Sequence, residues 1–173
     1  MKIIISGVAG VGKSTLAHFL KNNFFFLRKY KIEDYLIEKL FKGKKLPKFL
    51  KRKYLKKILK GIKVYSQSFV VKKYKLYSFY DKKRKSFVVN EEKFKEFFKH
   101  KENFILEGVA SHLVSTKDSI NIVLYTSPKK ILFRLIQRKY PFSKIKENIE
   151  AQKLDYHLNE LYKKNIKVTL IKI

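Results

Sequence analysis

The sequence predicts an α/β fold, a doubly wound parallel sheet of about five strands with helices on both faces. Short apolar runs typical of buried strands alternate along the chain with segments of helical periodicity. A glycine-rich turn joins the first expected strand, residues 2–6, to the first expected helix, residues 14–22. The chain has 173 residues and is 45% hydrophobic, so residues 1–173 can form one domain with a substantial core.

The amino-terminal half is expected to add a strand, two helices and a hairpin. Residues 24–27 are an apolar run typical of a second buried strand, and residues 32–42 have apolar side chains at helical spacing. An apolar stripe with lysines on the opposite face predicts a basic amphipathic helix over residues 47–60. The β-rich residues 64–80 and 87–89 flank a basic tip and predict a hairpin.

The carboxyl-terminal half continues the alternation of helices and strands. A serine followed by proline at 127–128 is typical of a helix start, and Pro141 is expected to stop that helix. Ser143 is expected to cap a last long helix. The expected helices cover 91–100, 127–140 and 143–161, and the expected strands cover 103–108, 119–125 and 166–173.

The charge balance is strongly basic. The chain has 42 basic and 14 acidic residues, a formal net charge of +28. The positive electrostatic field of such a surface favours contact with a polyphosphate such as RNA. The alternative explanation of the charge is codon bias, because lysine, isoleucine, phenylalanine, tyrosine and asparagine are all abundant and A/T-rich codons encode all of them. Cysteine is absent, which excludes disulfides and thiolate-held metal. No apolar stretch reaches the length of a membrane span, so we expect no membrane contact. With no cysteine and no signal-peptide pattern, we expect a cytoplasmic protein. We also expect a monomer.

Residues 7–14 carry the strongest functional signal. They read Gly-Val-Ala-Gly-Val-Gly-Lys-Ser and match the phosphate-loop pattern G-x-x-x-x-G-K-S between an expected strand and an expected helix. Glycines let main-chain N–H groups approach phosphate oxygens, and the helix start favours the same anion. We therefore expect this loop to bind ATP, with Mg²⁺.

Each position of the loop has an expected role. Lys13 should reach the β- and γ-phosphates, and the Ser14 hydroxyl should coordinate Mg²⁺. Thr15 is placed to bond the α-phosphate. We also expect Lys13 to lie on a surface loop, so that its replacement by alanine abolishes phosphoryl transfer with little loss of stability. The predicted nucleotide-binding residues are Gly10, Val11, Gly12, Lys13, Ser14, Thr15 and Arg138.

Other polar residues are candidates for the same site. Glu107 ends a strand expected beside the loop, where a carboxylate can hold the Mg²⁺ water shell. Arg134 and Arg138 share one helix face, and guanidinium groups neutralise a transferred phosphoryl group, so both are candidate catalytic residues. Asp34 is a candidate for acceptor binding or for capping its own helix. His112 is a candidate for positioning the acceptor or water, or a plain loop histidine.

Three segments resemble a known family. They are the phosphate loop with the residues after it, the sequence Leu-Glu-Gly-Val-Ala-Ser-His at 106–112, and Arg-Lys-Tyr at 138–140 with Lys-Ile-Lys-Glu-Asn-Ile-Glu-Ala at 144–151. The chain resembles the small archaeal and eukaryotic adenylate kinases that also act as ATPases in small-ribosomal-subunit maturation. Asp34 and its neighbours look like that family's monophosphate segment.

The resemblance implies a nucleoside monophosphate kinase-like fold. It implies a monophosphate-binding region over 31–90, in which the basic stretch 43–73 looks like an insertion, and a short lid over 137–147 from which Arg138 contacts ATP. Val109 stands where family members have a histidine, and Lys139 stands where they have a glycine.

Two functions follow as expectations from the resemblance. The first is transfer of the terminal phosphoryl group of ATP to a nucleoside monophosphate, most readily AMP, with accompanying ATPase activity. The second is an ATPase that acts in ribosome assembly, with rRNA and a small-subunit ribosomal protein as partners and without significant kinase activity.

Overall fold

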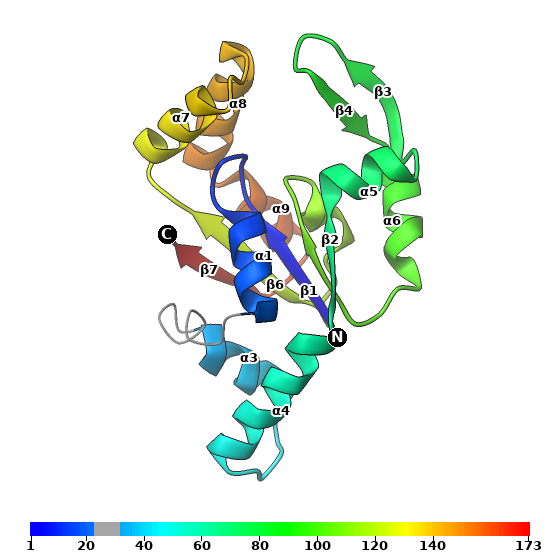
Figure 1. Ribbon diagram of the computed structural model, residues 1–173, viewed down its shortest axis with the longest axis vertical. Coiled ribbons are helices and arrows are strands. Elements are labelled where there is room, and N and C mark those ends of the chain that lie inside the picture. The colour runs from blue at the N-terminus through cyan, green and yellow to red at the C-terminus, as the bar shows by residue number, and fades with distance from the viewer. Residues whose placement is uncertain (23–31) are drawn as a thin grey trace.

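A parallel sheet organises the chain, as the sequence predicts. The computed structural model describes residues 1–22 and 32–173, and the predicted strand over 24–27 lies outside them. The described sheet has five strands in the order β2-β5-β1-β6-β7 (Figure 1). The neighbours in this order pair in parallel, which confirms the predicted fold class. The strands are β1 (Lys2–Ser6), β2 (Lys63–Ser66), β5 (Phe104–Glu107), β6 (Ile120–Tyr125) and β7 (Val168–Lys172).

The central strand β1 is buried on both faces. Ile3 and Ile5 point into one apolar cluster, and Ile4 between them points into another, because successive side chains of a strand alternate between faces. All three are fully buried. The continuous apolar run of β1 is therefore what a parallel sheet covered by helices on both sides requires.

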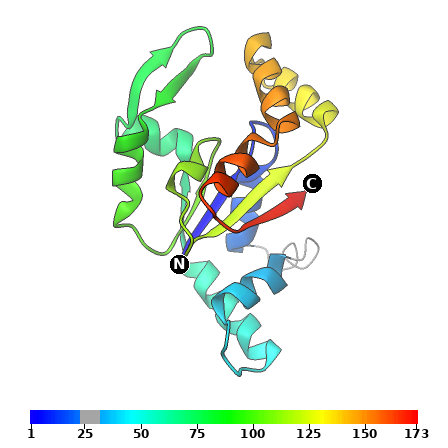
Figure 2. The ribbon, with the colours of Figure 1, turned by 180° about the vertical axis from the view of Figure 1, so that it is seen from behind.

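Helices cover the two faces. The Ile3 face packs against α1 (Lys13–Asn22), α3 (Ile32–Leu40), α4 (Lys48–Gly61) and α7 (Pro128–Gln137). The opposite face packs against α5 (Gln67–Lys73) and α6 (Glu91–Lys99), and α9 (Tyr156–Lys163) covers Val123 of β6. Figure 1 shows α1 in front of the sheet, and Figure 2, turned by 180°, shows α9 in front.

The order of the strands determines where a ligand can bind. The order of the strands reverses at β1, since β2 and β5 lie on one side of it and the later strands β6 and β7 lie on the other. In sheets of this type, ligands bind in the crevice beyond the carboxyl ends of the strands at that reversal. The turn between β1 and α1 lies at this position (Figure 1).

The prediction of continuous β structure over 64–80 is wrong in its middle. Residues 63–66 form β2 and pair with β5, but residues 67–73 form the helix α5. Only β3 (Tyr77–Asp81) and β4 (Ser86–Val89) form the predicted hairpin. Consecutive Val70 and Val71 are both buried, and their packing against the core outweighs the β-propensity of valine.

The predicted last long helix is interrupted. It consists of α8 (Phe142–Lys153) and α9, because Asp155 adopts a left-handed conformation with φ of 48°. The helix before it, α7, ends at Gln137, earlier than predicted. Lys139 has φ of 54°, and the N–H of Tyr140 bonds to the carbonyl of Leu135, which closes the helix end.

Two helix starts are capped by side chains, one of them at the predicted Ser127. Ser127 Oγ accepts a hydrogen bond from the N–H of Lys130 at the start of α7, with Pro128 in the first turn. Asn90 Oδ1 accepts one from the N–H of Lys93 at the start of α6. The predicted cap at Ser143 is wrong, since α8 begins at Phe142 with Pro141 before it. A short 3-10 helix, η1 (Ser111–Val114), follows β5.

The helices α3 and α4 form a unit at the amino-terminal edge of the sheet, remote from the β1–α1 turn (Figures 1 and 2). Buried Glu33 of α3 forms an ion pair with Arg52 of α4. Leu55 and Leu59 of α4 are buried in the main core, so the apolar stripe of the basic helix packs against the sheet layer. No helix in the described part of the chain is long and apolar enough to cross a membrane.

The basic stretch 43–73 is only partly peripheral. Its first part contains α4, but its second part contains β2 and α5, which belong to the sheet and to one face of the core. Removing the whole stretch would therefore remove an edge strand of the sheet.

The packing of α4 gives a first prediction. Leu55→Ala and Leu59→Ala should each lower the free energy of unfolding by about 2–5 kcal/mol, because each leaves a cavity in the core. Phe49→Ala on the same helix is the control, since Phe49 is 68% exposed and its loss should cost less than about 0.5 kcal/mol. Urea denaturation of the three variants tests this, and equal effects would contradict the packing.

Candidate nucleotide site

The turn between β1 and α1 is shaped by glycines in conformations that other residues avoid. Gly7 has φ of 141°, and a Cβ there would lie 2.8 Å from the carbonyl oxygen of Leu124 in β6. Gly12 has φ of 106° at the step before α1. The loop can therefore run close to β6 and present its main-chain N–H groups at the start of the helix.

Lys13 is buried, contrary to the expectation of a surface lysine. It is 7% exposed, and its Nζ donates a hydrogen bond to the carbonyl of Val8 at 2.8 Å. Burial lowers the pKa of Lys13 to about 8, an effect that Glu107 opposes and Arg138 reinforces. The loop thus holds a cation that water does not solvate, and a phosphate would offset that desolvation.

The structure brings both predicted arginines towards this loop. Arg134 Nη1 donates to the carbonyl of Gly10 at 2.9 Å, and the charge of Arg138 is close enough to affect Lys13. Arg134 lies in the last turn of α7, and Arg138 directly follows that helix. Lys13 and Arg134 therefore both bond to carbonyls of this loop, while exposed Arg138 acts on Lys13 only through its charge.

Glu107 ends β5 beside β1, opposite Ile5 in the sheet register, and is buried. Ser14, which is exposed, and buried Glu107 both line a cavity of about 420 Å³, so the two predicted metal residues face a common space. That cavity runs along α1 and is also lined by Ala17, His18, Lys21, Asn22, Val64 and Ser66. Thr15 is exposed in the first turn of α1, and Val11 is buried in the core.

Asp34 is not brought to the loop. It lies in α3 at the amino-terminal edge of the sheet, and its carboxylate pairs with Lys48 of α4 at 3.0 Å. Both side chains are largely exposed. The reason is topological: α3 and α4 come before β2, and α4 leads into the amino end of that strand.

Comparisons with known proteins agree with this geometry. A sequence profile for the family described as "AAA domain" matches residues 3–155. The chain belongs to this P-loop family. It is 32% identical over 164 residues to a Methanocaldococcus jannaschii protein named "Putative adenylate kinase", covering 92% of this chain and 71% of the relative. A Methanococcus maripaludis protein of the same name is 45% identical over 64 residues, 37% of this chain and 34% of that protein.

The P-loop of this family member has a support that sequence reasoning missed. Asn148 Oδ1 of α8 accepts a hydrogen bond from the N–H of Ala9 at 2.7 Å, while Asn148 Nδ2 donates to the carbonyl of Lys144 at 2.7 Å. Asn148 belongs to the segment 144–151 that carries the family resemblance, but nothing local in the sequence indicates that it touches the loop.

The segment after Glu107 has a second missed support. Gln67, the first residue of α5, accepts a hydrogen bond from the N–H of Ala110 at 2.6 Å, and its side chain fills the space where Gly108 lacks one. Ser111 Oγ lies 2.8 Å from the carbonyl oxygen of Ile5. The carboxyl end of β5 is thereby fixed to α5 on one side and to β1 on the other.

His112 belongs to a buried layer behind this segment. His112 Nδ1 lies 3.1 Å from the carbonyl oxygen of Val109, and His157 Nε2 lies 2.9 Å from the same oxygen. Burial lowers the pKa of His112, and lowers that of His157 to about 3. Both rings are therefore neutral at ordinary pH, and each can donate one N–H to Val109.

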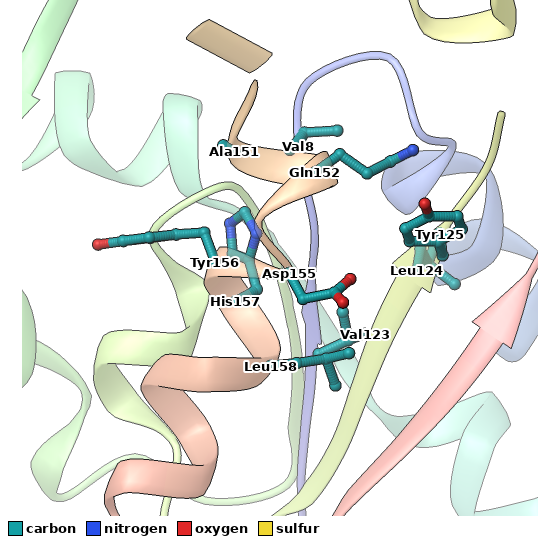
Figure 3. Close-up of a pocket in the computed structure, with 10 residues that line it drawn as sticks. All are labelled: Val8, Val123, Leu124, Tyr125, Ala151, Gln152, Asp155, Tyr156, His157 and Leu158. Carbon is teal, nitrogen blue, oxygen red and sulfur yellow. The ribbon is translucent and has the colours of Figure 1, made fainter. Parts of the chain in front are cut away.

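A second, very small cavity lies next to His157. Figure 3 shows it between Val8 of the phosphate loop, Gln152 of α8 and His157 of α9. Its volume is about 10 Å³, about the space of one water molecule, so it cannot hold a nucleotide. Gln152 Nε2 donates to the carbonyl of Thr126, which ties α8 to the end of β6. This cavity belongs to the packing that supports the loop.

The buried ammonium gives a second prediction. The folded chain lowers the pKa of Lys13 from 10.5 to about 8, so protonation of Lys13 opposes folding. This cost is complete below pH 8 and disappears as pH rises from 8 to 10.5. Lys13→Met should therefore raise the free energy of unfolding at pH 7 by up to about 3 kcal/mol, with a smaller gain towards pH 10.5.

Urea denaturation of the wild-type chain and Lys13→Met, at several pH values from 7 to 10.5 without nucleotide, measures this difference. The matched control is Lys21→Met, because Lys21 is an exposed lysine on the same helix. A Lys13→Met variant that is less stable than wild type throughout would contradict the desolvation.

Proposed function

We propose that this protein is a nucleoside monophosphate kinase that moves the terminal phosphoryl group of ATP to AMP or a related monophosphate. The observation that carries the proposal is that Lys13 and Arg134 both bond to the glycine-rich loop at the carboxyl edge of the sheet, with the charge of Arg138 acting on Lys13. The names of the two archaeal relatives support the class of acceptor.

In this mechanism the loop cations exchange protein partners for phosphate oxygens. Lys13 leaves the carbonyl of Val8 and binds the β- and γ-phosphates, and Arg134 leaves the carbonyl of Gly10. Lys13 is already poorly solvated, so it stabilises the charge on the transferred group more strongly than it would in water. An acceptor phosphate oxygen forms the new P–O bond while the bond from the γ-phosphorus to the β–γ bridging oxygen breaks, and ADP leaves.

A magnesium ion fits this site through few protein ligands. The described residues contain no cluster of three acidic or histidine side chains suited to a metal, and Mg²⁺ commonly uses phosphates, waters and one or two protein groups. Ser14 and Glu107 share one cavity wall and would hold the ion with its waters. When bound, the ion neutralises phosphate charge.

We place the acceptor at the carboxyl edge rather than at Asp34. At this edge α5 is fixed through Gln67 to the segment after Glu107, and the β3–β4 hairpin follows α5 in the chain. Reacting atoms must come within about 3.5 Å of each other, and the ion pair of Asp34 with Lys48 lies at the other edge of the sheet. The region 63–90 therefore takes the acceptor role in this proposal.

Nucleotide turnover tests the proposal. AMP should speed ATP consumption and yield two ADP per ATP, whereas Lys13→Ala should lose at least a hundredfold of this activity because the phosphate cation is gone. Asp34→Asn should leave the KM for AMP within a factor of two of wild type. A coupled assay with a panel of monophosphates measures both. If no monophosphate stimulates turnover, the kinase reaction is refuted.

A second function is favoured by the exposed side of α4. This helix carries seven basic residues and no acid, and Phe49, Tyr54 and Ile58 lie exposed among them. Cations for phosphates and aromatic rings for bases are the usual elements of a surface that binds single-stranded nucleic acid. We therefore propose, as the alternative, an ATPase of small-ribosomal-subunit maturation that contacts rRNA and a ribosomal protein, as a cytoplasmic monomer.

RNA binding tests that surface. A variant with four α4 lysines replaced by glutamine should bind single-stranded RNA more weakly, and its plot of log K against log salt concentration should be flatter by roughly 0.7 for each lost phosphate contact. The substituted residues are Lys53, Lys56, Lys57 and Lys60.

The matched control removes the same charge elsewhere on the exposed surface, at Lys93, Lys117, Lys164 and Lys167. Substitution is used instead of deletion because β2 follows α4 directly. Equal effects of the two variants would show that net charge, and not α4, determines binding.

A further inference from the structure

The tip of the β3–β4 hairpin touches the start of α8 across the phosphate loop. Arg84 Nη2 lies 2.9 Å from Glu147 Oε1, and Lys144 Nζ donates to the carbonyl of Arg84 at 3.3 Å. The two segments are 60 residues or more apart in sequence. Figure 1 shows the hairpin and the α7–α8 pair as two arms that rise on either side of the β1–α1 turn.

Each arm is anchored to a different part of the site. Glu147 is followed by Asn148, whose side chain holds the N–H of Ala9 in the phosphate loop. The hairpin follows α5, whose Gln67 holds the segment after Glu107. The contact between Arg84 and Glu147 therefore links the element that supports the phosphate loop to the element that supports the segment after Glu107.

The charges at this contact are unusual for the chain. The tip reads Lys82-Lys83-Arg84-Lys85, and the first two turns of α8 carry Lys144 and Lys146, so the two arms should repel each other. Only 14 residues of the chain are acidic, yet Asp81 and Glu147 both lie at the contact. Asp81 Oδ1 accepts a hydrogen bond from the N–H of Arg84 at 2.9 Å and holds the tip in shape.

We propose that Arg84 and Glu147 are positioning residues that latch the hairpin onto the lid, so that phosphoryl transfer proceeds without water. This inference rests on the proposed kinase function. A triphosphate between two basic arms would draw them together, and the latch would keep them closed. Exclusion of water separates transfer to an acceptor from hydrolysis.

The strength of the contact suits a latch that opens at every turnover. Arg84 and Glu147 are each about half exposed, at 50% and 44%, and ion pairs in that setting shift an equilibrium by about two- to fivefold. Such a pair biases the arms towards the closed form without preventing product release.

The first experiment measures the geometry. The chain contains no cysteine, so Lys83→Cys with Ser143→Cys provides one spin label on each arm of an otherwise native protein. With an ATP analogue bound, the background should give a narrow, short distance distribution. Arg84→Gln and Glu147→Gln should each broaden it and shift it outward by a similar amount, and the double variant should add little, because both remove one contact.

The second experiment measures the chemistry in the unlabelled chain. Arg84→Gln and Glu147→Gln should raise the fraction of ATP lost to water, in the presence of saturating AMP, by about two- to fivefold. Arg84→Lys should partly restore the wild-type ratio because it retains the charge but not the fork of donors. Lys82→Gln and Glu150→Gln are matched controls, since they remove the same charges from the same arms away from the contact.

The results separate the two proposals. If wild type hydrolyses ATP but never phosphorylates a monophosphate, the kinase function fails, while the spin-label distances still decide whether the arms are latched. If the distance distributions of Arg84→Gln and Glu147→Gln match those of the controls, the latch is refuted. An unchanged ratio of hydrolysis to transfer with altered distances would refute its role in excluding water.

Discussion

A single desolvated ammonium is the constraint on which the site depends. Lys13 is buried at the start of α1, where its ammonium bonds to the carbonyl of Val8. Burying a charge is unfavourable, so the surrounding structure has to impose it. Nearly every other feature of the site fixes the loop that carries this lysine.

The supports of the loop come from all parts of the fold. β6 contacts Gly7, α7 supplies Arg134, and α8 supplies Asn148. The charge of Glu107 opposes the lowering of the Lys13 pKa by burial. The segment after Glu107 is held in turn by Gln67 and the buried histidines. A site of this kind is preorganised, because the groups that would meet the phosphates are held in place by contacts unrelated to the ligand.

The strongly basic composition has different consequences in different places. On α4 the lysines face solvent around an apolar stripe that packs on the core, so most of their charge is compatible with a merely solvated helix face. At the hairpin tip and the first turns of α8, in contrast, the same charge lies on two segments that contact each other. Asp81 and Glu147 supply acidic partners for Arg84 at that contact.

The features that depend on neighbouring residues can be predicted from the amino-acid sequence alone. The phosphate loop, the strand before it and the helix after it are local, so the pattern from Gly7 to Ser14 predicted them correctly, as it did the alternating order of most strands and helices. Features that depend on partners far away in the sequence could be identified only from the folded chain. Residues 67–73 form a helix because Val70 and Val71 pack in the core. Asp34 lies at the amino edge of the sheet because α3 and α4 pack there. Asn148 contacts Ala9, which is 139 positions away in the sequence. Local patterns cannot specify these placements, because a side chain at such a distance is positioned only when the whole sheet is assembled.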